Sequence, residues 1–149
     1  MDEMSSRAMA SLALGLALAA SASFGGARAQ TTATMALPDC LGKPVVKPTT
    51  VTFACGDGNF LIEKLRWTGW GESFAAATGT FEANDCTPNC AAGHFHAYKG
   101  VIVASGSQKC PDGTQAYATV RYAFFGRAPF GANAPGSQDP SQTFTCKPH

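Results

Sequence analysis

The chain has 149 residues, of which 45% are apolar and only 14% are charged, with 11 Lys and Arg against 10 Asp and Glu. Soluble domains carry roughly 25% charged residues, so this chain is unusually poor in charge. Its length allows one domain, and its formal net charge of +1 excludes the basic surface that nucleic-acid binding requires. The apolar content is too low for a membrane protein with several spans.

The first predicted element is an export signal. Residues 8–24 form an apolar run without charge, and Ala-Arg-Ala follows at 27–29. This order is typical of a secretory signal peptide and predicts cleavage after Ala29, hence a secreted or extracytoplasmic protein. The run falls short of the about 20 strongly apolar residues of a membrane span, so we expect no stable span in the mature chain. A retained anchor is the alternative, because the segment ahead of the run lacks the usual positive bias.

Six cysteines follow the signal segment, at Cys40, Cys55, Cys86, Cys90, Cys110 and Cys146. An even number in an exported chain favours up to three disulfides, whose pairing the spacing leaves open. A bridge between Cys40 and Cys146 would restrain the two ends of the mature chain. Cys86 and Cys90 either close a small ring or bond to different partners.

Alternating apolar and polar residues predict strands after a Pro/Thr-rich lead-in at 30–49. The runs lie at 50–55, 60–70, 94–105 and 114–125, and an Asp-Gly turn separates the first two. About six strands joined by turns favour an all-β fold, a small antiparallel β-sandwich or barrel with disulfides. This β-domain covers residues 50–126, and a Gly/Pro/Ser-rich tail at 127–149 follows it.

Three places interrupt the regular alternation. Phe74 and the three alanines at 75–77 allow a short helix, although Thr78-Gly79-Thr80 argues against extending it. Lys99-Gly100 predicts a break in the strand at 94–105. Gly69 and Gly71 flank Trp70 and predict a bend or bulge.

Part of the chain resembles a known group of proteins. The sequences CGDGN at 55–59, L-x-W-x-x-W-G at 65–71 and NDCTPNCAAGHFHAY at 84–98 are similar to those of small exported bacterial proteins common in actinomycetes. The resemblance covers about residues 50–104. It implies export and carries over no activity, because these proteins mostly lack an assigned function.

Metal binding is the first chemistry to consider. His94 and His96 share one side of a strand, and Asp57 or Asp85 could supply a further ligand. The alternative is two exposed or hydrogen-bonded histidines beside a loop. A zinc site of these histidines with Cys86 and Cys90 has no standard zinc spacing.

Calcium binding is a second candidate chemistry. Asp57 and Asn59 on one turn, with Asn84 and Asp85 on another, could supply oxygen ligands. Asp and Asn at turns more often accept hydrogen bonds from nearby backbone N–H groups. The sequence therefore predicts neither a metal nor a cofactor.

Aromatic side chains are the remaining candidates for binding. Trp67 and Trp70 lie three residues apart, so a regular strand would point them to opposite faces. One would be core and the other exposed, unless the glycines introduce a bulge. An exposed Trp70 with Tyr98 nearby could stack on a sugar or anchor a partner protein.

No catalytic constellation emerges from the sequence. The chain lacks a G-x-S-x-G motif and an H-E-x-x-H motif. We therefore expect a non-enzymatic binding or cell-envelope domain whose partner is an extracytoplasmic protein or glycan. The alternatives are a secreted protease inhibitor and a metal-dependent enzyme using His94 and His96.

Overall fold

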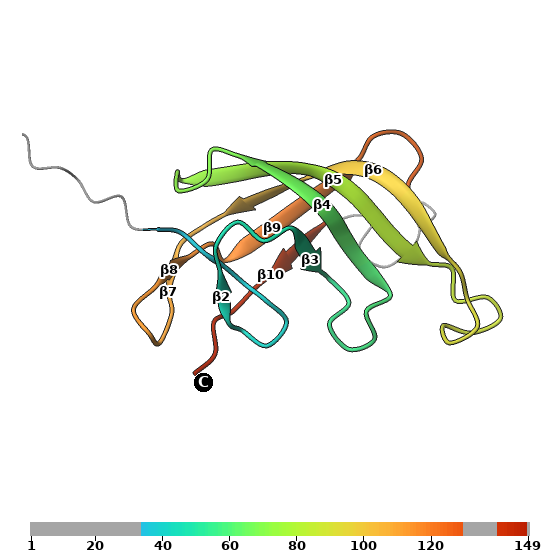
Figure 1. Ribbon diagram of the computed structural model, residues 1–149, viewed down its shortest axis with the longest axis horizontal. Coiled ribbons are helices and arrows are strands. Elements are labelled where there is room, and N and C mark those ends of the chain that lie inside the picture. The colour runs from blue at the N-terminus through green and yellow to red at the C-terminus, as the bar shows by residue number, and fades with distance from the viewer. Residues whose placement is uncertain (1–33, 130–139, 149) are drawn as a thin grey trace, which may run out of the picture. The chain divides into compact units, whose positions relative to one another are not determined.

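The computed structural model describes residues 34–129 and 140–148 and shows an all-β fold (Figure 1). Its main sheet has six antiparallel strands in the order β10-β9-β6-β5-β4-β3. These strands are β3 (Thr50–Thr52), β4 (Phe60–Thr68), β5 (Phe74–Asn84), β6 (Phe95–Ser105), β9 (Thr119–Phe124) and β10 (Ser141–Thr143). The sheet curls into a half-barrel, so the predicted small antiparallel fold is confirmed.

Two short hairpins accompany the sheet. β1 (Leu37–Pro38) pairs with β2 (Pro44–Val45), and β7 (Gln108–Lys109) pairs with β8 (Gln115–Ala116). Within the described ranges, no helix has the length and apolar character needed to cross a membrane. The predicted signal peptide lies outside the described residues.

The sheet has two ends with different neighbours. The loop end is formed by the turn at 54–59, between β3 and β4, and by the loop at 85–94, between β5 and β6. The tryptophan end lies at the other ends of these strands and contains Trp67, Trp70 and Tyr117. In Figure 1 the loop end lies to the right, and the β7–β8 hairpin extends to the left.

A bulge in β4 keeps its apolar residues on one face. The pairing shifts by one residue between Glu63 and Arg66, and Lys64 has a φ of 58°. Ile62 before the bulge and Leu65 after it are therefore both buried, although they lie three residues apart. The bulge explains why the apolar pattern changes phase along the strand. The bend predicted around Trp70 is also present, as a turn in which Gly69 and Gly71 have positive φ.

The segment 74–77 belongs to β5, so the short helix that the sequence allowed there does not form. β6 also runs unbroken through Lys99-Gly100, because Gly100 pairs with Gly79 in register. A Cβ on Gly100 would lie 2.5 Å from the Phe81 ring and 2.4 Å from the backbone oxygen of Ala123. The glycine therefore lets the ring pack directly on the neighbouring strand, where the sequence pattern indicated a break.

The flanking segments contribute to the same core as the central strands. Leu37 from the lead-in is 1% exposed and Phe144 from the tail is 5% exposed. The predicted strand at 114–125 is divided into β8 and β9, and Tyr117 lies fully buried between them. Its hydroxyl accepts a hydrogen bond from Gly71 N–H and donates one to the Glu72 carbonyl, each at 3.0 Å.

The two edge strands of the main sheet are connected by a side chain. Gln142 in β10 donates from Nε2 to the carbonyl oxygen of Phe53, which follows β3, at 3.0 Å. The rings of Phe53 and Phe144 also approach, with their centroids 6.2 Å apart. The curl thus brings the first and last strands together without a backbone ladder between them.

Three disulfides join Cys40 to Cys55, Cys86 to Cys90 and Cys110 to Cys146. The suggested disulfide between Cys40 and Cys146, at the two ends of the mature chain, is therefore wrong. Cys40 bonds to the turn after β3, whereas Cys146 bonds beside the β7–β8 hairpin. Cys86 and Cys90 bond to one another and close a small ring, rather than bonding to different partners. Three disulfides indicate an oxidising, extracytoplasmic location.

Candidate functional site

The loop at 85–94 connects the two longest strands and projects from the sheet. It is closed at its base by a hydrogen bond of 3.0 Å from Asp85 N–H to the His94 carbonyl oxygen. The residues at 87–92 are all exposed to solvent. The loop therefore presents a short segment to solvent while its base continues the β5–β6 ladder.

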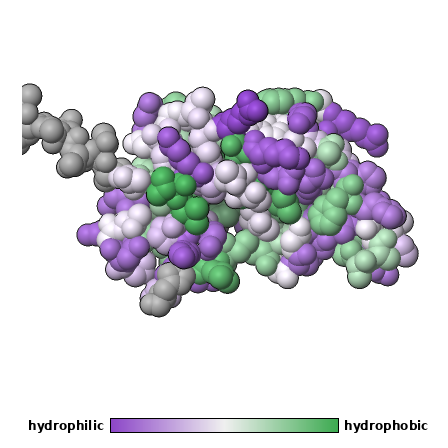
Figure 2. Space-filling model, viewed as in Figure 1, coloured by the Kyte–Doolittle hydropathy of each residue, from purple (hydrophilic) through white to green (hydrophobic). Residues whose placement is uncertain are grey.

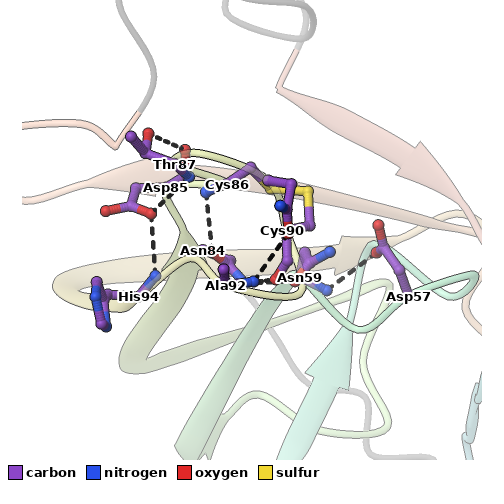
Figure 3. Close-up of a disulfide and its surroundings, with 10 residues drawn as sticks. Asp57, Asn59, Asn84, Asp85, Cys86, Thr87, Cys90, Ala92 and His94 are labelled. Carbon is purple, nitrogen blue, oxygen red and sulfur yellow. Dashed lines mark hydrogen bonds between the residues drawn. A yellow bond between two sulfur atoms is a disulfide. The ribbon is translucent and has the colours of Figure 1, made fainter.

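Asn84, at the end of β5, holds both cysteines of this loop (Figure 3). Its side-chain oxygen accepts from Cys86 N–H at 2.9 Å, and its Nδ2 donates to the Cys90 carbonyl at 2.9 Å. The same Nδ2 donates to Asn59 Oδ1 at 2.8 Å, which connects the loop to the neighbouring turn. Asn84 is only 9% exposed, so these bonds satisfy a buried amide. We call this arrangement the Asn84 clamp.

Gly93 leaves the space that the Asn84 clamp occupies. A Cβ at this position would lie 2.1 Å from Asn84 Oδ1 and 2.8 Å from Cys86 N. Any larger residue would force the amide or the loop backbone to move. In the sequence, the sign of the Asn84 clamp is the glycine at 93, shortly after the two cysteines. Nothing in the sequence pattern indicates that Asn84 fills the space beside this glycine.

Asp85 fixes the remaining part of the loop through its carboxylate. Oδ1 accepts from His94 N–H at 3.0 Å and from Thr87 N–H at 3.1 Å, and Oδ2 lies 3.0 Å from His96 Nε2. The bond from His94 N–H, followed by those from the His96 side chain and Thr87 N–H, holds the pKa of Asp85 well below its ordinary value. The carboxylate is thus a hydrogen-bond acceptor for the loop.

Asp57 has a similar local role on the neighbouring turn. Its Oδ1 accepts from Asn59 N–H at 3.1 Å, and this bond lowers the pKa of Asp57. The proposed calcium oxygens therefore fall into two separate groups. Asn59 and Asn84 meet by bonding to one another, and the carboxylates of Asp57 and Asp85 each serve their own turn.

The predicted metal ligands come together only in part. His96 and Asp85 form a pair, but in the described part of the chain no three His, Cys, Asp or Glu residues group in a way that could hold a metal ion. The zinc set is wrong, because Cys86 and Cys90 form a disulfide and offer no thiolates. His94 is exposed and contributes its backbone N–H to the loop.

Of the predicted binding aromatics, Trp70 lies at the tryptophan end, whereas Tyr98 lies in the half of β6 that adjoins the loop at 85–94. Trp70 is half-buried, its ring packs edge-on against Trp67, and its Nε1–H donates to the Met35 carbonyl at 2.9 Å. Both tryptophans contact the same core, which is the stated exception to opposite orientations: β4 ends at Thr68, and a turn that includes Gly69 and Gly71 carries Trp70 back. Tyr98 is half-buried beside Phe124.

The surface offers shallow hollows near the lead-in. One of about 420 Å³ lies beside Trp70 and Met35, and another of about 360 Å³ follows the outer edge of β3. On the face drawn in Figure 2, apolar and polar residues form small separate patches, with no continuous apolar surface. Neither hollow lies at the loop at 85–94. At that loop, hydrogen bonds and a disulfide hold a segment of exposed residues in place.

Comparisons with protein-family models, with curated proteins and with solved structures gave no match to this chain.

Proposed function

We propose that this chain is an exported domain that binds an extracytoplasmic partner, a protein or glycan, through the loop at 85–94. Export is supported by the predicted signal peptide with cleavage after Ala29, by three disulfides, and by the resemblance to small exported bacterial proteins. The binding role rests on one observation: an exposed segment is held in place by a disulfide, the Asn84 clamp and Asp85.

Such bracing matters because a loop that is already ordered loses little conformational freedom when it binds. The loss of rotamer and backbone freedom otherwise opposes association. Thr87 and Asn89 lie within the ring, are exposed and offer polar groups, and Phe95 is 51% exposed where the loop returns to β6. The loop thus combines polar atoms with one apolar side chain.

The proposal is tested by binding of the labelled secreted protein to two fractions of the organism that produces it, cell-wall glycan and envelope protein. Replacing Thr87 and Asn89 together by Arg should weaken saturable binding about tenfold or more. Lys109→Glu, an exposed change at the tryptophan end, is the control and should leave binding unchanged. The proposal fails if neither fraction binds saturably, or if both variants have equal effects.

A protease inhibitor is the second candidate, because an exposed, braced loop is what such inhibitors present. It would give stoichiometric inhibition of a protease, with cleavage near Thr87 or Asn89. Cys86 has a φ of 51°, which departs from the extended backbone that a protease cleft accepts. The absence of inhibition across a protease panel would exclude this role and leave the binding proposal standing.

A further inference from the structure

The three disulfides differ in what they connect. Cys110–Cys146 joins residues 36 apart in the sequence, and Cys40–Cys55 joins residues 15 apart. Both connect a flanking segment to the sheet region, so reducing either frees a segment that contributes to the core. Cys86–Cys90 joins residues only 4 apart, inside one loop. Reducing this bond releases no other part of the chain.

Hydrogen bonds hold the ring of Cys86 and Cys90 independently of its sulfur bond. The Asn84 clamp binds the backbone of Cys86 and of Cys90, each at 2.9 Å. Two hydrogen bonds of 3.0 Å close the base of the loop. Asp85 N–H donates to the His94 carbonyl oxygen, and His94 N–H donates to the Asp85 carboxylate. The two cysteine backbones therefore stay close together when the disulfide opens, and the ring can close again without a folding step.

The ring is also open to an incoming reactant. Cys90 is exposed and Cys86 is half-buried, so Cys90 is the first of the two to meet a thiolate from solvent. By contrast, Cys110 is 3% exposed and lies in a small buried cluster with Ala36 and Ala116. Cys55 is exposed and Cys40 is half-buried, so the Cys40–Cys55 bond is as open to solvent as the ring, but it joins two separate segments of the chain rather than two residues of one loop. Exposed disulfides are the ones that exchange with other thiols, whereas buried ones resist reduction.

From these observations we propose that Cys86–Cys90 is a thiol–disulfide exchange site that accepts electrons from a dithiol of another exported protein or peptide. This covalent activity goes beyond the proposed binding function and does not depend on it. The Asn84 clamp keeps the two sulfurs within reach of one another in both redox states. The remaining disulfides keep the fold intact while the exchange takes place.

The reaction balances without a further reactant. One thiolate of the dithiol attacks Cys90 Sγ and forms a mixed disulfide, and Cys86 Sγ leaves with the bonding electron pair and takes a proton from water. The second thiolate of the dithiol then attacks its own sulfur in the mixed disulfide and displaces Cys90 Sγ, which is also protonated. The dithiol loses two electrons and two protons, and the ring gains both as two thiols.

The first experiment is a redox titration of the intact protein in glutathione buffers, followed by alkylation and mass-spectrometric mapping of each cysteine. We expect Cys86 and Cys90 to become alkylated in the mildest buffers, while the other four cysteines stay oxidised and the near-ultraviolet dichroism of the tryptophans is unchanged. The proposal is overturned if another pair is reduced first, or if reduction of this pair coincides with loss of the tryptophan signal.

A variant of the clamp tests how the ring is held. Asn84→Ala removes two hydrogen bonds to the cysteine backbones, so this ring should be reduced in buffers about tenfold less reducing. The matched control is Gln108→Ala, whose amide bonds instead to the backbone beside Cys146, and it should leave the midpoint of the ring unchanged. Equal shifts in both variants would contradict the role of the clamp, and the titration of the unaltered protein stands even if Asn84→Ala does not fold.

The second experiment measures exchange directly. A reduced peptide with the sequence pattern Cys-x-x-Cys is mixed with one equivalent of the oxidised protein, and peptide oxidation is followed by chromatography. We expect up to one peptide disulfide per protein, and none with a Cys86→Ser, Cys90→Ser variant whose other disulfides are intact. Equal peptide oxidation by the protein and by this variant would refute the proposal.

Discussion

An amide side chain and a disulfide lie together at each end of the sheet, Gln108 with Cys110–Cys146 and Asn84 with Cys86–Cys90. The residues that they connect lie far apart in the sequence at one end and close together at the other. At the tryptophan end, Gln108 bonds to the backbone of Tyr117, Phe144 and Cys146, the last two more than 35 residues away. At the loop end, Asn84 bonds to Cys86 and Cys90 in the adjoining loop, and to one neighbouring turn through Asn59. Gln108 with Cys110–Cys146 therefore contributes to global stability, and Asn84 with Cys86–Cys90 mainly fixes the shape of one loop, whereas Cys40–Cys55 ties the lead-in to the turn at the loop end.

The largest effect is expected where a bridge crosses the longest sequence separation. Replacing Cys110 and Cys146 together by Ala should lower the free energy of unfolding by about 4 kcal/mol, because the denatured chain regains the freedom of a long loop. Urea denaturation followed by tryptophan fluorescence measures this loss. A change below about 1 kcal/mol would contradict the global role of the tryptophan end.

The next effect concerns Trp70, a predicted binding aromatic. Trp70→Ala removes its packing on Trp67 and Tyr117 and the bond to Met35, and should cost about 3 kcal/mol of unfolding free energy. Chemical denaturation gives this value. If stability were unchanged while ligand binding disappeared, the side chain would belong to a binding surface.

A smaller effect is expected from the ring at the loop end. Replacing Cys86 and Cys90 together by Ala should cost about 2 kcal/mol or less, because the closed loop is short and Asn84 still holds its backbone. The variant is compared with the Cys110 and Cys146 variant under the same denaturant. A loss equal to that of the longer bridge would remove the distinction between the two ends.

The smallest effect is local and depends on pH. The pKa of Asp85 is lowered well below its ordinary value of 3.8, so its bonds to the loop are fully present above pH 3.8 and are lost only as pH falls through the lowered pKa. Nuclear magnetic resonance of the His94 and Thr87 amides should show them shifting only well below pH 3.8, where the lowered pKa lies, while amides of β5 stay unchanged. Asp85→Asn should abolish this titration, and its persistence would assign the change to another group.

The alternation of apolar residues predicted the strands because each lines one face of a curled sheet. It failed where packing overrides local preference. Alanines favour helices in isolation, yet Ala75 and Ala77 lie buried in β5, where their small size suits the core. Gly100 marked a break in the pattern, but it is the residue on which Phe81 packs. The bulge at Lys64 could not be predicted from the sequence. One inserted residue shifts the alternation of apolar and polar residues, and no particular residue type marks the insertion.

The candidate site was predictable only in its parts. The sequence identified the loop, its two cysteines, and Asp85 as a possible partner of His96 on the adjoining strand. It did not identify Asn84 as the centre of the arrangement, because an asparagine before a loop reads as an ordinary turn residue. Its burial and its bonds to Asn59, 25 residues away, depend on the register of β4 with β5. The disulfide pairing likewise depends on which ends of the strands meet.

The side-chain bond from Gln142 to the Phe53 carbonyl bears on solubility. A sheet that remains open exposes edges to which strands of other molecules can add, and this is a common route to aggregation. Here each edge strand, β3 and β10, has only three residues, and the curl turns the two edges toward one another. The short, mutually facing edges thereby disfavour polymerisation of the protein through its own sheet.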